Sequence, residues 1–256
     1  MPTQFTIQSS DPALLEKATR IANEYAEAYQ RDGIVGIVFL GAIVRGYYDR
    51  AADVDIAIFK KQGSGITLPA QFFKIEDLEM HIHLVEYESE LTAAWDMSKR
   101  WAFSQAQIHY DPDGRIATLL ADKLPLKPDE KRWLEMSGLS LSNWYINDLT
   151  RVWVERGNPI SAQHMFFQGL NYFFDMLFAL NNELVADMKW RYYCVEQLKR
   201  LPAHFQERIQ EIMLLGSFST EELERRRTAF MEMWQEMKPI IEQEVGLSYE
   251  QIVALV

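Results

Sequence analysis

Two aspartates beside a short β-branched run offer the clearest chemistry in this sequence. Residues 54–59 are typical of a buried strand, and Asp53 and Asp55 lie two positions apart at its start. Because successive strand side chains alternate between faces, both carboxylates are predicted to project from one face. Adjacent carboxylates repel unless a cation lies between them, and their hard oxygens favour Mg²⁺. The pair therefore predicts a metal–phosphate site; the alternative is a solvated strand entrance.

A glycine-bounded segment precedes the aspartates. Residues 41–46 (GAIVRG) follow a strand predicted over 34–40, and five residues separate them from Ala52. Glycines let a backbone approach polyphosphate closely, and backbone N–H groups can cradle an anion. Strand, turn and carboxylates are thus predicted to act as one site.

This order resembles the signature of the nucleotidyltransferase superfamily, whose fold is shared with polymerase beta-like enzymes. The signature is strand, Gly-[Gly/Ser]-x-x-x-Gly, five residues, Asp-hydrophobic-Asp and strand, and its spacing matches here without a gap. The resemblance implies that Asp53 and Asp55 bind Mg²⁺ and that the segment containing Gly41, Ala42 and Gly46 binds nucleotide. Arg45 in the same segment is a further candidate for nucleotide binding. The family usually has serine where this chain has Ala42, and often again where it has Ala52.

A third carboxylate is expected from a neighbouring strand, to complete the metal shell or to take a proton from an attacking hydroxyl. We choose Glu79, which begins a strand predicted over 79–85, and the resemblance to aminoglycoside adenylyltransferases points to the same residue. Glu76, Asp77 and Glu86 are its competitors. His81 and His83 share the face of Glu79, where we expect them to pack or to hydrogen bond.

Two roles are open for Arg45, and both depend on its guanidinium. It neutralises phosphate, or it pairs with Asp49 and braces the glycine segment.

The first half of the chain is predicted to be mixed α/β. Helical spacing over 12–30 precedes the strands at 34–40 and 54–59, and two further strands are predicted near 71–75 and 78–86. A helix to about residue 103, a strand over 107–110 and a helix ending at Lys123 follow. We expect a boundary in the proline-rich segment 124–128, which divides the chain into a catalytic domain, 1–124, and a second domain, 125–256.

The second half is predicted to be a helical bundle, so the fold class is α+β with a small mixed sheet followed by an all-α domain. Helical segments are predicted over 129–156, 161–181, 188–200, 203–215 and 220–245. Aminoglycoside and lincosamide nucleotidyltransferases resemble this layout, and a family segment implies a phosphate contact for Lys189. Residues 164, 168, 171 and 175 form a polar stripe that lines a cleft or faces solvent. The triplet 225–227 is interpreted as a solvated basic face.

The amino-acid composition indicates which classes of binding partner the chain disfavours. Twenty-six Lys and Arg against 37 Asp and Glu give a formal net charge of −11, which disfavours DNA or RNA and attracts cations. The single cysteine, Cys194, cannot form an intramolecular disulfide. The N-terminal sequence lacks the features of a secretory signal, and no apolar run spans a bilayer. We expect a cytoplasmic protein of undetermined oligomeric state.

These expectations combine into one predicted activity. The chain is predicted to be a Mg²⁺-dependent enzyme that transfers a nucleoside monophosphate, AMP from ATP, to a hydroxyl of a small, cationic, antibiotic-like acceptor. The alternative is a degenerate relative that binds nucleotide or a protein partner without turnover. In that case Ala42 and Ala52, which lack the serine hydroxyls of the family, mark the loss of catalytic activity.

Overall fold

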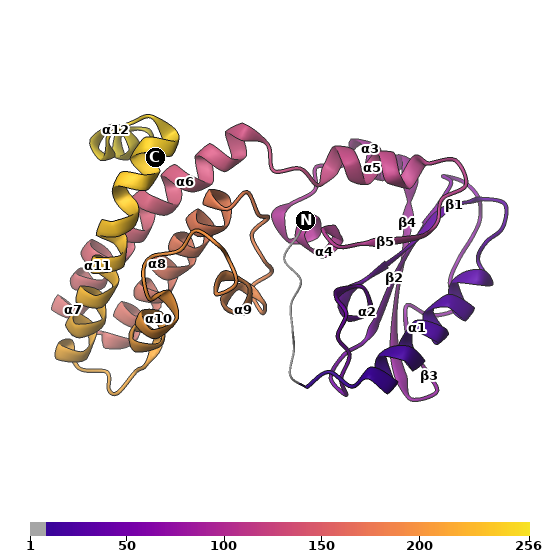
Figure 1. Cartoon of the computed structure of the whole chain (residues 1–256), viewed down its shortest axis with the longest axis horizontal. Helices are drawn as coiled ribbons and strands as arrows, with labels where there is room; N and C mark the ends of the chain where they lie inside the picture. The colour runs from indigo at the N-terminus through magenta and orange to yellow at the C-terminus, as the bar shows by residue number, and fades with distance from the viewer. Residues whose placement is uncertain (1–8) are drawn as a thin grey trace. The chain divides into compact units, whose positions relative to one another are not determined.

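The computed structural model describes residues 9–256 and divides the chain into two compact units. They are Met1–Pro125 and Leu126–Val256. The first unit contains a sheet with flanking helices, and the second is helical throughout its described elements (Figure 1). The predicted fold class, a small mixed sheet followed by an all-α region, is confirmed.

Five strands form the sheet of the first unit in the order β3-β4-β2-β1-β5. Their bounds are β1 Ile34–Leu40, β2 Val54–Lys60, β3 Phe72–Ile75, β4 Leu78–Glu86 and β5 Gln107–Tyr110. Strands β2 and β4 run parallel, and the other neighbours are antiparallel. All residues of β1 are buried, as its continuous apolar sequence predicts for a strand covered on both faces.

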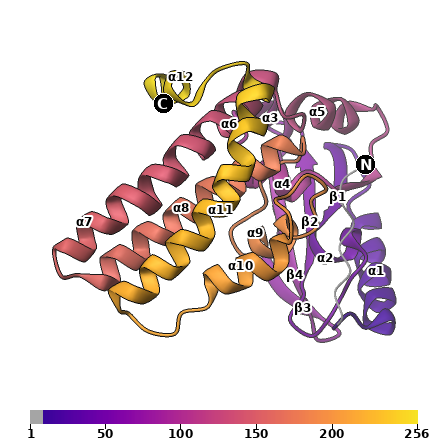
Figure 2. The same ribbon diagram turned by 60° about the vertical axis from the view of Figure 1, so that its left-hand side comes forward.

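Helices cover the two faces of this sheet. Helix α1, Pro12–Glu27, and helix α4, Met97–Phe103, lie on opposite sides (Figures 1 and 2). On the α4 side, Leu40, Ala57 and Phe59 belong to a buried apolar cluster with Phe103. Asp55 precedes Ala57 and Phe59 at the two-residue spacing of one strand face, so this face continues from an apolar core to a carboxylate.

The segment predicted as one helix to residue 103 is two helices. Helix α3, Tyr87–Thr92, ends where Ala93 becomes extended, with φ −64° and ψ 135°. Helix α4 begins after Asp96, whose side chain accepts a hydrogen bond from the Lys99 backbone N–H at 2.8 Å. This N-cap satisfies a backbone donor at the new helix start and accounts for the break. Helix α5, Arg115–Lys123, completes the unit.

The short segment between β1 and β2 is helical where a turn was predicted. Helix α2, Gly41–Arg45, occupies it, and Gly46 ends it in the left-handed region at φ 78°. The β3–β4 connection is a tight hairpin turn in which Glu76 and Asp77 have φ values of 47° and 70°.

The second unit consists of helices that match most predicted segments, but the helix predicted over 188–200 covers only Arg191–Val195. Their bounds are α6 Pro128–Asn143, the π-helix η1 Trp144–Leu149, α7 Thr150–Glu155, α8 Pro159–Leu180, α9 Arg191–Val195, α10 Phe205–Met213, α11 Thr220–Val245 and α12 Tyr249–Leu255. Helices α6 and α8 pack against each other, and α11 contacts both. Helix α12, which the periodicity did not predict, begins at Ser248 with a capping box.

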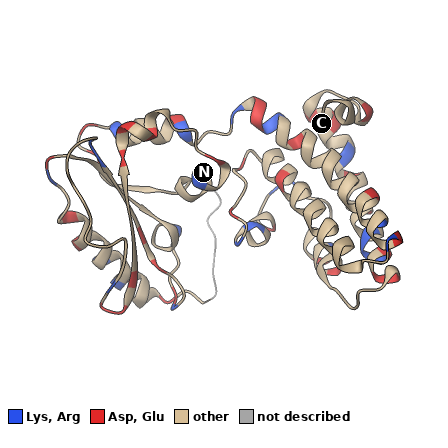
Figure 3. Ribbon diagram, turned by 180° about the vertical axis from the view of Figure 1, so that it is seen from behind, with Lys and Arg blue, Asp and Glu red and all other residues tan. Residues whose placement is uncertain are grey.

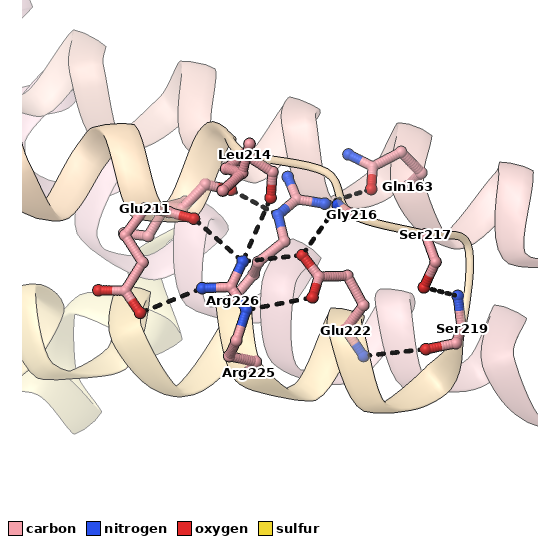
Figure 4. Close-up of polar contacts among 10 residues, drawn as sticks. Gln163, Glu211, Leu214, Gly216, Ser217, Ser219, Glu222, Arg225 and Arg226 are labelled. Atoms are coloured by element: carbon pink, nitrogen blue, oxygen red, sulfur yellow. Dashed lines mark hydrogen bonds and ion pairs between the residues drawn. The ribbon is translucent and has the colours of Figure 1, made fainter.

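The basic triplet 225–227 is not a solvated face, and this prediction was wrong. Arg226 is fully buried and donates hydrogen bonds to the Ile212 carbonyl and to Gln163 (Figure 4). Its guanidinium carbon lies 4.5 Å from the centre of the Phe166 ring. Helices α8, α10 and α11 meet at the Arg226 side chain. The packing of these three helices therefore buries it.

Charge is spread over the surface of each unit. Figure 3 shows acidic and basic residues interspersed along several helices of the second unit, whereas α8 carries a single charged residue of these types, Asp175. Among the described residues, no helix is both long and apolar enough to cross a bilayer. Cys194 is buried.

Candidate metal centre

Three side chains that can bind one ion lie together at the start of β2. Oxygen atoms of Asp53 and Asp55 and a ring nitrogen of His81 all lie within 4.8 Å of one another. The His81 Nδ1 atom lies 2.8 Å from Asp53 Oδ2 and 3.7 Å from Asp55 Oδ1. We call these three residues the carboxylate–imidazole group. It is the one such group of three or more metal-binding side chains in residues 9–256.

Strand register explains why these residues meet. Asp55 is the direct partner of His81 across the parallel pair β2–β4. Alternation then places Asp53, two residues before Asp55, on the same face. On the other side of β2, Asp55 pairs with Leu40, the last residue of β1, directly before α2. The group therefore lies where two strands and the β1–α2 junction converge.

Gly41 makes room for one of the carboxylates. Its φ is +67°, and a Cβ built there would lie 2.2 Å from Asp55 Oδ2. No side chain fits at that distance, and the left-handed backbone is itself costly for any residue with a Cβ. Nucleotide binding by Gly41 stays a prediction, and the structure shows that this glycine is the surface against which Asp55 lies.

The group is partly open to solvent. The side chains of Asp53, Asp55 and His81 are 36%, 23% and 29% exposed. Tyr48 is fully buried nearby, and burial together with the charges of Asp53 and Asp55 raises the pKa of its phenol to about 12. Burial, with a further contribution from His81, lowers the pKa of His83. The local field is negative and attracts a cation.

Two cavities of the first unit are lined by sequence neighbours of the group but not by the group itself. One, of about 290 Å³, is lined by apolar residues of β1, β2, β4 and α4, with His83 and Lys99 as its polar members. The other, of about 310 Å³, reaches from Ala52 to Glu79 and includes Lys17, Arg50 and Lys74. Both have room for a part of a small molecule within the first unit.

Glu79, predicted as the third carboxylate, lies outside the carboxylate–imidazole group. It pairs across the hairpin with Lys74, and its carboxylate is 3.3 Å from the Lys74 ammonium. Glu79 is two residues before His81 on the same exposed face of β4. His81 occupies the position opposite Asp55, so it, and not Glu79, is in register with the aspartate pair. The shared face was visible in the sequence, but the register was not.

Arg45 is directed into the protein. Its guanidinium carbon lies 4.0 Å from the centre of the Trp101 ring, and Nη2 donates to the Trp101 carbonyl at 3.2 Å. Only 6% of Arg45 is exposed. Asp49, the alternative partner considered for Arg45, accepts hydrogen bonds from Ser9 and from the Ala51 backbone N–H. The arginine thus anchors α2 to α4 by stacking and hydrogen bonding.

The remaining predicted nucleotide contacts lie in different surroundings. Ala42 is buried within α2, and Gly46 caps its end. Lys189 is exposed in a turn of the second unit, where its backbone N–H donates to Asp187. In the polar stripe of α8, Asp175 lies 3.3 Å from Arg191.

Comparisons with known proteins add a similarity in structure. No family model matches the chain. No curated protein matches it. The chain resembles the crystal structure of a nucleotidyltransferase-like protein from Exiguobacterium sibiricum 255-15. The two share 14% identity with a TM-score of 0.48, over 90% of this chain and 77% of that one.

Proposed function

We propose that this chain is a metal-dependent nucleotidyltransferase. It transfers a nucleoside monophosphate, with AMP from ATP as the expected donor, to a hydroxyl of a small molecule and releases pyrophosphate. The observation that carries the proposal is the convergence of Asp53 and Asp55 beside Gly41, in the sequence order that resembles the superfamily signature. The acidic surroundings favour a cationic acceptor.

The residues fit a divalent ion. Two carboxylates at the start of β2 lie beside a ring nitrogen from β4, and their donor atoms are grouped closely enough to surround one ion. A bound divalent ion supplies charge neutralisation at the phosphates and polarises the α-phosphate. Asp53 and Asp55 hold that ion and thereby position the triphosphate.

Proton transfer is assigned to Glu79. The acceptor hydroxyl oxygen forms a bond to the α-phosphorus, the bond from that phosphorus to the pyrophosphate oxygen breaks, and the hydroxyl proton passes to a carboxylate. Glu79 is exposed on the face that carries His81, and its only described partner among residues 9–256 is the equally exposed Lys74. Positioning and charge stabilisation supply most of the acceleration in such transfers.

Transfer of label from α-³²P-ATP to a panel of hydroxyl acceptors, with pyrophosphate release measured in parallel, tests this function. Asp55→Asn should lower turnover by about 10³-fold or more, because it removes a metal ligand. Asp77→Asn is the matched control, since Asp77 is exposed in the hairpin turn and asparagine tolerates its left-handed φ of 70°. Wild-type turnover by Asp55→Asn would overturn the proposal, provided that both variants retain the wild-type circular dichroism spectrum.

A second candidate function is nucleotide sensing without turnover. The contact between His81 and Asp53 favours it, because an imidazole N–H that donates to Asp53 can satisfy the aspartate pair in place of an ion. Nucleotide binding that is independent of added divalent ion, with no pyrophosphate release from any acceptor, would select this candidate over the transferase.

A further inference from the structure

We propose that His81 is a direct metal ligand, and that the carboxylate–imidazole group therefore selects Mn²⁺ over Mg²⁺. This inference rests on the metal site of the proposed function and names the ion that the site prefers. It follows from three features of the first unit, namely donor spacing, ring orientation and ligand chemistry.

Donor spacing fits a single ion. Two donors about 2.1 Å from an ion, at angles of 90–109°, lie about 3.0–3.4 Å apart. The His81 Nδ1 atom is 2.8 Å from Asp53 Oδ2 and 3.7 Å from Asp55 Oδ1. These separations bracket the expected spacing, so an ion can enter with shifts of a few tenths of an ångström.

Neighbouring strands fix the orientation of the imidazole. Phe72 is the cross-strand partner of His81 on β3, and its ring meets the imidazole edge-on at 4.9 Å between centroids. On the opposite side, β2 presents Asp55 in register. The ring is thereby held between an aromatic side chain and two carboxylates, with Nδ1 directed to the carboxylate oxygens. A ligand held in position before binding loses less conformational entropy when the ion arrives.

Ligand chemistry then determines the choice of ion. Mg²⁺ takes oxygen ligands in octahedral geometry and gives up its water reluctantly. Imidazole nitrogen best suits Zn²⁺, Cu²⁺, Fe²⁺ and Ni²⁺, and Mn²⁺, which prefers carboxylate oxygens, is the weakest binder of the first-row series. As a transition-metal ion, Mn²⁺ still accepts a nitrogen ligand more readily than Mg²⁺ does. Glu79, the carboxylate that would restore an all-oxygen set, is instead paired with Lys74. Of these two ions, a set of two oxygens and one nitrogen favours Mn²⁺ over Mg²⁺.

The test compares Mn²⁺ and Mg²⁺ binding by the full chain. Free Mn²⁺ is measured by electron paramagnetic resonance, and Mg²⁺ by its displacement of Mn²⁺. The variants are His81→Asp, which restores a third carboxylate, His81→Gln, which removes the nitrogen ligand, and His83→Gln as the matched control. His83 lies on the same strand face, two residues along, outside the group.

Each variant has a defined outcome. His81→Gln should weaken Mn²⁺ binding by about 10- to 100-fold, and His81→Asp should lower the preference for Mn²⁺ over Mg²⁺ by about tenfold or more. His83→Gln should keep wild-type values. Wild-type affinity and preference in both His81 variants would overturn the inference.

A measurement on the wild-type chain guards against misfolded variants. Bound Mn²⁺ should show ¹⁴N modulation in its electron spin echo, which reports a directly bound ring nitrogen. A bound ion without that modulation overturns the inference, as does the lack of any bound Mn²⁺ at millimolar concentration. Label transfer that proceeds with Mg²⁺ and is unaffected by His81→Gln would reject this inference and leave the proposed function standing. Nitrogen-coordinated Mn²⁺ without transfer to any acceptor would support this inference and reject the proposed function.

Discussion

Two groups of charged side chains, one in each unit, differ in how the protein surrounds them. In the carboxylate–imidazole group, two like charges lie side by side and remain partly exposed. In the helical unit, Arg226 is completely buried and is matched by a carbonyl, an amide oxygen and an aromatic face. The first arrangement leaves a charge that a ligand can neutralise. The second surrounds its charge with neutral groups of the protein, and only Arg226 Nη2 has no hydrogen-bond partner among the described residues.

The Arg226 cluster continues into an exposed network that supports it. Arg225 donates to Glu222 and Glu211, and the Arg225 hydrogen bond holds the pKa of Glu222 down to about 2 (Figure 4). Burial lowers the pKa of Arg226 itself. The contrast predicts that the buried charge stabilises the fold, whereas the partly exposed aspartate pair stays available to a ligand.

The largest effect is expected from Arg226→Met. It leaves the Ile212 carbonyl and the Gln163 amide without their donor, so the free energy of unfolding of the helical unit should fall by about 2–4 kcal/mol. Urea unfolding followed by tryptophan fluorescence measures this loss. Mn²⁺ binding by the first unit should stay at the wild-type level.

Arg151→Met is the control for that substitution. The Arg151 side chain is 64% exposed, and its acidic neighbours lie 3.8 and 3.9 Å away. Its stability change should stay within about 0.5 kcal/mol. Equal losses from both arginines would remove the distinction between a buried and a solvated guanidinium.

A smaller effect is expected from Gly41→Ala. The added Cβ meets Asp55 Oδ2, so the carboxylate must move, and Mn²⁺ affinity should fall about 10- to 100-fold, or about 1.4–2.7 kcal/mol. Gly63→Ala is the control because Gly63 has a φ of +71° but open space around its Cβ position. Both variants should lose about 1–2 kcal/mol of stability from the left-handed backbone, and only Gly41→Ala should lose metal. Equal metal affinity in the two would show that the Gly41 contact does not hold Asp55.

Local sequence patterns predicted most elements of this fold. The run from Ile34 to Leu40 is buried on both faces, and its length and β-branched content predicted the strand that the structure shows. The aspartate pair was equally predictable from the sequence, because alternation along one strand places Asp53 and Asp55 on the same face. These features depend on neighbours within a few residues.

Features that depend on distant neighbours were missed. His81 joins the aspartates through the register of β2 against β4, which lie 26 residues apart at the Asp55–His81 pair. Arg226 is buried because Gln163 and Ile212, from two other helices, offer acceptors. An arginine triplet on a helix carries no local sign of such partners, and a glutamate at a strand start carries no sign of the lysine that pairs with it.

The smallest expected effect is on the free energy of unfolding and concerns Asp175, a partly buried carboxylate of the helical unit. Burial raises its pKa to about 6 from the ordinary 3.8, and Arg191 offsets only part of that rise. The folded chain therefore takes up a proton between pH 7 and pH 4 that the unfolded chain takes up only below about pH 4. The free energy of unfolding should rise as the pH falls through 6, since protonation removes a buried charge.

Asp175→Asn tests this sign. The amide carries no charge at any pH, so the variant should lack the rise between pH 7 and pH 4.5. At pH 7 it should be more stable than wild type by about 1 kcal/mol, because Arg191 loses its partner and offsets part of the gain. Urea unfolding at both pH values measures the difference, with Asp148→Asn as the control at an exposed carboxylate. A variant that keeps the wild-type rise would show that Asp175 is ionised in the folded chain throughout this range, as solvated carboxylates are. The helical unit would then tolerate a charge much as the carboxylate–imidazole group does.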